Sequence, residues 1–469
     1  MADFRLHKLD EYKLRIESEL SLLMEMRAAF TYKPQGYKFM PAYKYGQWDG
    51  TICLLDCKTR TISQGLLPQM IQWCRSNYCS IELADDIIHR FDNADAWFDD
   101  WEQYSSMKPY DYQLDAAKKA IRLNKVLIKS PTGSGKSLIL HSILSFLMSN
   151  TDYKALITVP SKQLVEQVQK DMVEYHAPMK AHLGSRIIVS TWQGVYKKEK
   201  DYFEQFDAYI CDEAHMADGK SITGIVEKLR NTAKIRIGLT GTLDGSKCHE
   251  MQLRSLFGPI VETRSTKELM NDGKLTPLDT TIHVLKHSKA HKMVDYQDEV
   301  KWLAECTERN HFIIDQAAKT DGNILVLFNY IDHGKKLFEM AKLYQDKKEC
   351  YYISGETPVQ EREAIRAKIA KQNNIMLFAS YGTFQVGINA PNISYLMLAH
   401  PTKSQIRTLQ SIGRVLRKNT GKSQAMLIDI ADDLAPKRKS KNHTYRHMIE
   451  RMKIYDREQF RYKIKEHDL

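Results

Sequence analysis

The octapeptide SPTGSGKS, Ser130 to Ser137, separates two apolar segments of different character. The segment before it, VLIK, is short and largely apolar, which is typical of a buried strand. The segment after it, SLILHSILSFLM, contains no helix breaker and predicts a helix. A strand, a glycine loop and a helix in this order direct backbone N–H groups and the positive end of a helix dipole at one point, where a phosphate binds. The sequence therefore predicts a phosphate-binding loop.

The loop ends in the last three residues of the pattern G-x-x-x-x-G-K-[ST], while Ser130 replaces the first glycine of that pattern. Its glycines allow the backbone to approach a phosphate closely. We expect Lys136 to bind the β- and γ-phosphates and Ser137 to ligate Mg²⁺. A Gly/Ser turn with a surface lysine is the alternative. The predicted nucleotide-binding residues of the loop are Thr132, Gly133, Ser134, Gly135, Lys136 and Ser137.

Short apolar runs alternate with helical segments from residue 126 onward, which predicts parallel sheets covered by helices on both faces. A break at Asn271-Asp272-Gly273-Lys274 suggests a hinge between two such α/β domains. The strands of the first are expected at 126–129, 155–159, 186–190, 208–211 and 235–240. Those of the second are expected to begin at Ile324, Tyr351, Ile375, Tyr395 and Ala425.

The length of 469 residues predicts about three domains. We expect a small α+β domain at 1–105, an ATP-binding α/β domain at 106–275, and a second α/β domain with a basic C-terminal segment at 276–469. In the first of these, YKLRIESELSLLMEMRAAF predicts a strand followed by a helix. Trp48-Asp49-Gly50 predicts a turn between strands.

The chain carries a net charge of +11, concentrated in PKRKSKNHTYRHMIERMK and REQFRYKIK near its C-terminus. Basic residues interleaved with aromatic ones suit a nucleic-acid backbone, and a solvated helix face is the alternative. An apolar run long enough for a membrane span is missing, and the charged N-terminus is not typical of a signal peptide, so we expect a cytoplasmic protein. The spacing of the cysteines at 53, 57, 74 and 79 does not favour zinc.

The tetrapeptide DEAH, Asp212 to His215, follows the predicted strand AYIC directly. We expect Asp212 to hold Mg²⁺ and Glu213 to polarise the attacking water as a general base. An acidic helix cap is the alternative. At another strand end, the hydroxyls of Thr240 and Thr242 are candidates for linking the nucleotide site to the neighbouring domain, and an ordinary polar loop is the alternative.

In the second α/β domain the segment QSIGRVLRK contains Gln410, Arg414 and Arg417. The two arginines are three residues apart, which predicts that they share one helix face. An arginine on the γ-phosphate stabilises the charge of the transition state, so these three residues join Lys136, Asp212 and Glu213 as predicted catalytic residues. A basic helix that binds phosphate elsewhere is the alternative.

These motifs, in this order, resemble those of the superfamily-two helicases, and the resemblance covers about residues 110–430. The segment YDYQLDAA places Tyr110 and Gln113 where the family reads adenine, and FASYGTFQVGINAP places Gly387 in its coupling motif. VPSKQLVEQ and VSTWQG are similar to the motifs that contact the nucleic-acid strand. The predicted nucleic-acid contacts are Ser161, Lys162, Thr191, Trp192, Ser380, Tyr381 and Thr383. For the aromatic rings in this set, core packing is the alternative to stacking on a base.

The N-terminal segment GYKFMPAYKYGQWDGTICLLD makes the chain most similar to the phage UvsW recombination helicases. This resemblance implies two tandem RecA-like parallel-sheet domains after a small α+β domain, with ATP and Mg²⁺ as cofactors. It implies a monomer that processes branched or partly single-stranded DNA (forks, Holliday junctions, D-loops and R-loops) in recombination, repair and replication. It also implies single-strand-binding or recombination proteins as partners, and the host cytoplasm as the location. An RNA helicase, a duplex translocase and a nucleotide-gated binding protein are the alternatives.

Overall fold

The computed structural model describes residues 2–34, 36–87, 89, 91, 94–216, 219–288, 293, 295–344, 346–387, 392–419, 422–435 and 441–469. The chain divides into two compact units, Met1–Ser130 with Gly135–Thr263, and Arg264–Leu469 with Pro131–Ser134. No helix among these described residues is both long enough and apolar enough to cross a bilayer.

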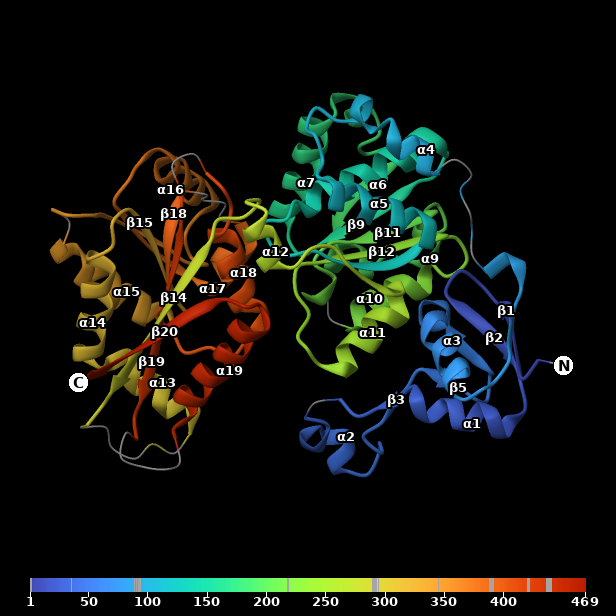
Figure 1. The fold of residues 1–469 in the computed structure, drawn as a ribbon, viewed down its shortest axis with the longest axis horizontal. Helices are drawn as coiled ribbons and strands as arrows, with labels where there is room; N and C mark the ends of the chain where they lie inside the picture. Colours follow the sequence, from blue (N-terminus) through green and yellow to red (C-terminus); the bar gives the residue numbers. More distant parts are fainter. Residues whose placement is uncertain are drawn as a thin grey trace. The chain divides into compact units, whose positions relative to one another are not determined.

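The N-terminal part of the first unit is a mixed sheet in the order β5-β6-β2-β1-β7, accompanied by two longer helices (Figure 1). Apolar side chains alternate along β1, so Phe4 and Leu6 enter the core while Arg5 lies outside it. The strand and helix predicted before residue 30 are confirmed as β2 and α1. The bounds are β1 Phe4–Lys8, β2 Lys13–Glu17, β5 Leu55–Asp56, β6 Thr61–Ser63, β7 Ile81–Leu83, α1 Leu20–Ala29 and α3 Leu67–Ser76.

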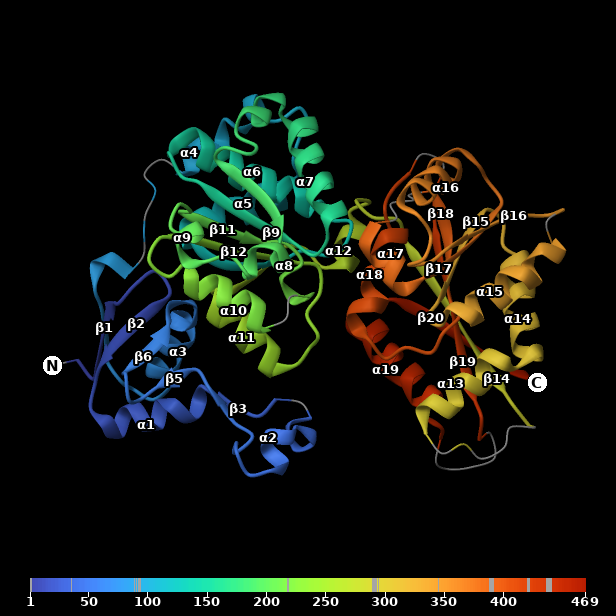
Figure 2. The same cartoon turned by 180° about the vertical axis from the view of Figure 1, so that it is seen from behind.

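A separate lobe is inserted between α1 and β5, and Figures 1 and 2 show it extending away from the N-terminal sheet. Its stem is a short antiparallel pair, β3 Thr31–Tyr32 with β4 Ile52–Cys53. We call residues 33–51 the aromatic lobe. It contains the 3₁₀ turn η1, Tyr37–Phe39, and the single-turn helix α2, Pro41–Lys44. The turn predicted at 48–50 is therefore only the last part of a longer excursion.

The rest of the first unit is a parallel sheet in the order β10-β9-β11-β12-β8-β13, which confirms the predicted fold class. Helices α5, α6 and α7 cover one face and α10 and α11 cover the other (Figures 1 and 2). The five predicted strands are present to within one residue. The strands are β8 Lys125–Lys129, β9 Ala155–Val159, β10 Ile187–Thr191, β11 Ala208–Cys211, β12 Ile235–Thr240 and β13 Ile260–Glu262. The helices are α4 Ala94–Asp99, α5 Asp111–Leu123, α6 Lys136–Asn150, α7 Lys162–Tyr175, α8 Trp192–Tyr196, α9 Lys200–Phe203, α10 Gly219–Lys228 and α11 Lys247–Phe257.

A buried charged cluster joins the N-terminal sheet to this parallel sheet. Arg236, in the middle of β12, is fully buried and donates from Nη1 to the backbone oxygen of Glu11 at 2.6 Å. Its guanidinium carbon lies 5.1 Å from the centroid of the Tyr12 ring. Lys125 Nζ lies 3.3 Å from Glu11 Oε2, and burial is the main reason that the pKa of Lys125 falls to about 7. Buried charges are tolerated only with such partners, so the two parts form one unit.

The second unit is a parallel sheet in the order β16-β17-β15-β18-β19-β14-β20, which confirms the second RecA-like domain. Helices α14 and α15 lie on one face and α18 and α19 on the other (Figure 1). The strands are β14 Leu278–Lys286, β15 Asn323–Phe328, β16 Glu349–Ile353, β17 Ile375–Ser380, β18 Ile393–Leu398, β19 Ala425–Asp433 and β20 Arg461–Asp468. The helices are α12 Thr266–Asn271, α13 Tyr296–Glu305, α14 Thr307–Ala318, α15 Ile331–Ala341, α16 Val359–Lys371, α17 Tyr381–Gly387, α18 Gln405–Val415 and α19 His443–Arg457.

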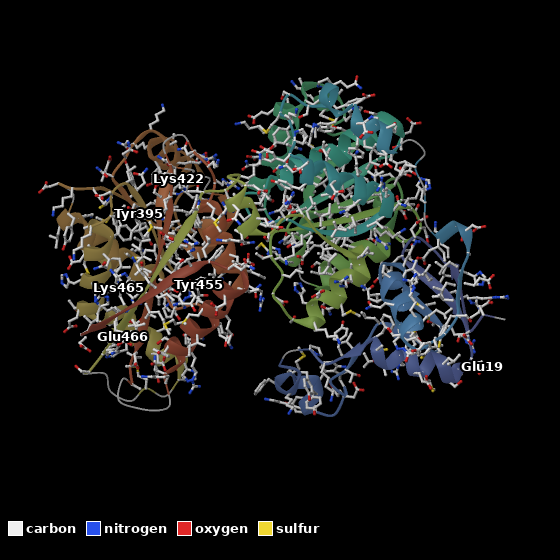
Figure 3. All side chains as sticks on the ribbon, viewed as in Figure 1. Glu19, Tyr395, Lys422, Tyr455, Lys465 and Glu466 are labelled. Carbon is white, nitrogen blue, oxygen red and sulfur yellow. The ribbon has the colours of Figure 1, made fainter. Side chains whose placement is uncertain are left out.

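The described part of the basic C-terminal segment, residues 441–469, is part of this fold, while residues 436–440 lie outside the described residues. Arg451, on α19, is fully buried and its Nη2 lies 2.7 Å from Asp429 Oδ1 of β19. Tyr455, one turn further along α19, donates to the same carboxylate at 2.8 Å (Figure 3). Beyond the helix, β20 pairs with β14, and Lys465 and Glu466 lie along it (Figure 3). The side chain of Arg451 is thereby committed to the core and does not contribute to a nucleic-acid surface.

A second buried charged group lies at the end of β19. His287 Nε2 is 3.0 Å from Asp432 Oδ1, and Arg309 Nε lies 2.9 Å from the same oxygen. Burial lowers the pKa of His287, but hydrogen bonds to Asp432 and Cys306 outweigh it and raise this pKa to about 9. The imidazolium is therefore the folded-state form at neutral pH.

This shift predicts a pH dependence of stability for the second unit. A pKa of about 9 exceeds the ordinary value of 6.5, so the stabilisation is complete below about pH 6.5 and is lost as pH rises through 9. We expect the free energy of unfolding to fall by at most about 3 kcal/mol over that range. Trp302, whose ring lies 5.1 Å from His287, is a local probe, and a fluorotryptophan signal would report this unit's unfolding. The His287→Gln variant should lose most of the slope, and an unchanged slope in it would contradict the assignment.

Candidate active site

The phosphate-binding loop connects β8 to α6, as the sequence predicts. Gly133 and Gly135 have φ of +88° and +84°, in the left-handed region that favours glycine. Gly135 caps the N-terminus of α6, a helix of 15 residues, so unpaired N–H groups and the helix dipole point at the loop. Lys136 and the half-buried Ser137 begin this helix, and Ser134 Oγ donates to the backbone oxygen of Pro131 at 2.6 Å. The geometry is that of an anion cradle.

Lys136 meets the acidic motif at this cradle. Its Nζ lies 3.5 Å from the backbone oxygen of Ser130 and 3.8 Å from Glu213 Oε1. Only 13% of the Lys136 side chain is exposed, so the ammonium group is held in place rather than free in solvent. The structure therefore brings the predicted phosphate-binding lysine and the predicted general base within reach of one another.

Asp212 follows β11 directly, and its backbone N–H donates to Thr158 of β9 at 2.9 Å. Burial, followed by the charge of Glu213, raises the pKa of Asp212 to about 7, while Lys136 lowers it. A desolvated carboxylate beside a second carboxylate is an arrangement that a divalent cation stabilises. Glu213 has φ of 49°, which is uncommon for a residue with a side chain and occurs more often at functional sites.

His215 connects this acidic motif to the end of β12, a link that the sequence analysis missed. Its Nδ1 lies 3.5 Å from Glu213 Oε2 and 2.6 Å from Thr240 Oγ1. The Thr240 hydroxyl donates to the backbone oxygen of Thr242 at 2.7 Å, so His215 Nδ1 is the donor to Thr240. Burial lowers the pKa of His215 to about 4, which keeps the imidazole neutral near pH 7. The adjacency of His215 to Glu213 in the DEAH motif was the available signal.

Gln113, the predicted adenine-reading residue, lies against the loop. It is buried in the first turn of α5, where its Oε1 accepts from the Tyr110 backbone N–H at 2.8 Å. A Cβ placed on Gly135 would lie 2.3 Å from Gln113 Nε2, and φ there is +84°, so glycine is strongly favoured at this position. Tyr110 is 42% exposed and stacks on Tyr112. The structure thus places the Gln113 carboxamide beside the phosphate cradle.

The predicted strand contacts of the first unit lie at the carboxyl ends of β9 and β10. Ser161 caps α7 by accepting from Leu164 N at 3.3 Å, and Lys162 is exposed at the first position of that helix. Thr191 caps α8 in the same way. Trp192 is 6% exposed and packs in the core, so its ring offers no free face for stacking.

In the second unit, Ser380 Oγ and Thr383 Oγ1 lie 2.8 Å apart at the start of α17. Tyr381 is 1% exposed, so for this ring too the structure shows core packing. Base stacking by Trp192 or Tyr381 is therefore wrong for the structure described, because stacking needs an accessible ring face. Gly387 ends α17, and residues 388–391 of the predicted coupling motif lie outside the described residues.

Gln410 is buried within α18, and the Arg414 guanidinium lies 5.4 Å from the centroid of the Phe384 ring. The helix ends at Val415, so Arg417 follows it rather than sharing a helix face with Arg414. The expectation that both arginines lie on one helix face is therefore wrong.

Three family models match the chain along its length. Residues 106–245 match the res subunit of type III restriction enzymes, and residues 305–419 match the helicase conserved C-terminal domain. Residues 3–84 match the N-terminal domain of the DNA helicase UvsW. The ATP-dependent DNA helicase uvsW of Enterobacteria phage T4 is 34% identical, over 99% of this chain and 99% of that protein.

The chain belongs to the UvsW helicase family. The crystal structure of T4 UvsW is similar at a TM-score of 0.51 and 31% identity, covering 99% of both chains. A fragment of a putative HsdR subunit of a type I restriction enzyme from Vibrio vulnificus YJ016 is similar in fold at a TM-score of 0.62 and 16% identity, covering 100% of this chain and 92% of that one. These findings confirm the family and fold class that the motifs predict.

Proposed function

We propose that this UvsW-family chain is an ATP-dependent DNA helicase that unwinds or branch-migrates branched DNA. The observation that carries the proposal is the set of contacts at the phosphate loop, where Lys136, Glu213 and His215 lie together at the carboxyl edge of the first parallel sheet. A protein that only binds nucleotide has no need of a carboxylate held beside the phosphate-binding lysine. Full-length similarity to a DNA helicase supports DNA as the substrate.

The proposed roles follow from the chemistry of each group. The N–H groups of the loop and Lys136 bind the phosphates of ATP, and Ser137 and Asp212 hold Mg²⁺, which neutralises phosphate charge. Glu213 takes a proton from the attacking water. His215 and Thr240 orient Glu213, and Gln113 with Tyr110 contacts the adenine. Gln410, Arg414 and Arg417 act on the γ-phosphate, and Gly387 belongs to the nucleotide-binding set.

The same proposal assigns a role to each domain. Residues 1–105 form the N-terminal domain, 106–275 the ATP-binding domain, and 276–469 the second helicase domain. The helix α4 packs into the core of the ATP-binding sheet through Ala94 and Phe98. Ser161, Lys162, Thr191, Ser380 and Thr383 contact phosphates, which suits a motor that ignores base sequence. The protein acts as a monomer in the host cytoplasm, in recombination, repair and replication.

One assay tests this function. We expect the steady-state ATPase rate, at one fixed salt concentration, to rise strongly with a four-way junction or single-stranded DNA. Structured RNA and blunt duplex DNA are the comparison substrates. Stimulation by RNA alone would indicate an RNA helicase, and stimulation by duplex without strand separation would indicate a translocase. An ATPase rate that none of these substrates raises would contradict a nucleic-acid motor.

A further inference from the structure

The aromatic lobe exposes apolar rings that its own fold does not bury. Phe39 and Tyr45 are each 78% exposed and Met40 is 40% exposed, within seven residues of one another. None of the described lobe residues belongs to the buried core cluster of the N-terminal sheet. Exposed apolar side chains that lie close together are typical of interaction surfaces, whereas single scattered ones are not.

Contacts within the lobe nevertheless hold several of its side chains together. The rings of Tyr37 and Tyr43 meet edge to face with centroids 4.9 Å apart. Trp48 Nε1 donates to the Thr51 backbone oxygen at 2.6 Å. Gly50 has φ of +80°, and a Cβ there would lie 2.3 Å from the Tyr37 ring. The lobe therefore has a built framework of Tyr37, Tyr43 and Trp48 that presents Phe39 and Tyr45 outward.

The charge of the lobe identifies its partner. Lys33, Lys38 and Lys44 are all exposed, and Lys33 Nζ lies 5.2 Å from the Tyr37 ring centroid. The one carboxylate in residues 33–51, Asp49, is hydrogen-bonded within the lobe by Thr51, and these bonds lower its pKa. Lysines beside exposed rings suit a single-stranded nucleic acid, because phosphates meet ammonium groups while unpaired bases stack. Paired bases in a duplex have no free face to offer.

We propose that the aromatic lobe binds the single-stranded DNA arm of a branched substrate, with Phe39 and Tyr45 stacking on unpaired bases and Lys38 and Lys44 on phosphates. The inference rests on the proposed DNA helicase function and adds the substrate feature that the N-terminal domain recognises. Because the buried Arg236–Glu11 contact joins that domain to the ATP-binding sheet, the lobe belongs to the same compact unit as Lys136 and α6.

The double variant Phe39→Ala/Tyr45→Ala tests the stacking. A fork with 2-aminopurine in its single-stranded arm is the probe, without nucleotide and at fixed salt. We expect the wild-type protein to quench the 2-aminopurine fluorescence, and the variant to lose the quench and bind at least about fivefold more weakly. ATPase stimulation by saturating single-stranded DNA should stay within about twofold of wild type.

A matched control is Tyr78→Asn, which removes a ring that is 98% exposed in the same domain, and asparagine tolerates the local φ of 56°. It should behave as wild type. The Lys38→Gln/Lys44→Gln variant should reduce the slope of log affinity against log salt by about 0.7 per lost phosphate contact.

Unchanged quenching and fork affinity in Phe39→Ala/Tyr45→Ala would overturn the proposal, and so would an equal loss of affinity for blunt duplex. The fork can also be made as RNA with the same sequence. If the variant loses affinity for the RNA fork but not for the DNA fork, the lobe binds RNA instead. If the wild-type protein showed no DNA-stimulated ATPase, the proposed function itself would fail. If the wild type is stimulated and the variant matches it in quenching and in fork affinity, only this inference fails.

Discussion

Replacement of Lys136 by alanine is expected to reduce ATP turnover by at least about a thousandfold. The ammonium group lies 3.8 Å from Glu213 Oε1, and its charge lowers the pKa of Asp212. Its loss removes the charge that stabilises the transferred phosphate and leaves two carboxylates facing each other. Steady-state phosphate release with saturating single-stranded DNA measures the effect.

Lys129 provides the matched control, since it lies at the other end of the loop. It is 34% exposed and its Nζ lies 2.9 Å from Glu262, an exposed pair that contributes little. Lys129→Ala should therefore retain turnover.

Glu213→Gln should bind ATP but hydrolyse it about a hundredfold or more slowly, as expected for loss of a general base. Arg414→Ala should likewise spare ATP binding while stopping hydrolysis. Normal turnover in Lys136→Ala would refute the assignment of the loop.

The second large effect is expected on stability, from Arg451→Met. Arg451 and Asp429 both have fully buried side chains, joined at 2.7 Å, and Arg451 Nη1 also donates to the Thr402 backbone oxygen at 2.7 Å. Removing the guanidinium leaves a buried carboxylate whose main cation is gone. We expect the second unit to lose about 3–5 kcal/mol of unfolding free energy, measured by urea denaturation.

Two comparisons separate this mechanism from a general effect on α19. Lys453→Ala, on the same helix, removes a 61% exposed side chain paired with Glu450 and should change stability by less than about 0.5 kcal/mol. The double variant Arg451→Met/Asp429→Asn should recover much of the loss, because the uncompensated charge is then absent. A single Arg451→Met variant as stable as wild type would contradict the buried pair.

The strands that the sequence predicts correctly are those in which burial produces a continuous run of apolar residues. The central strands, such as ILVLF of β15, are continuous apolar runs because both faces of a parallel sheet are covered. β14, with the sequence LDTTIHVLK, is largely buried and pairs with a strand on each side, but it carries threonine and histidine, so its pattern resembles neither a buried apolar run nor a helix. β20, with the sequence RYKIKEHD, lies at the edge of its sheet. Its many charged side chains discourage pairing with another chain, but they also hide the apolar pattern by which strands are predicted.

The candidate site shows the same division. The loop and the acidic motif are local patterns, so the roles of Lys136, Asp212 and Glu213 are predictions from short stretches of sequence. The contact of Gln113 with Gly135 and the burial of Tyr381 depend on packing between segments far apart in the chain. The pattern of a single sequence does not reveal which distant segments pack together. For the same reason, the buried cluster around Arg236 could not be predicted from sequence.

That cluster limits how the chain can be cut and recombined. A protein that begins after residue 105 would keep Arg236 and Lys125 but lose Glu11, Tyr12 and the helix α4 that packs on the same sheet. The remaining helicase core would present two uncompensated cations on an apolar surface, so a loss of activity on truncation could reflect misfolding alone. Exchange of N-terminal domains between relatives would succeed only where the incoming domain brings a backbone acceptor, a carboxylate and a ring for these two side chains.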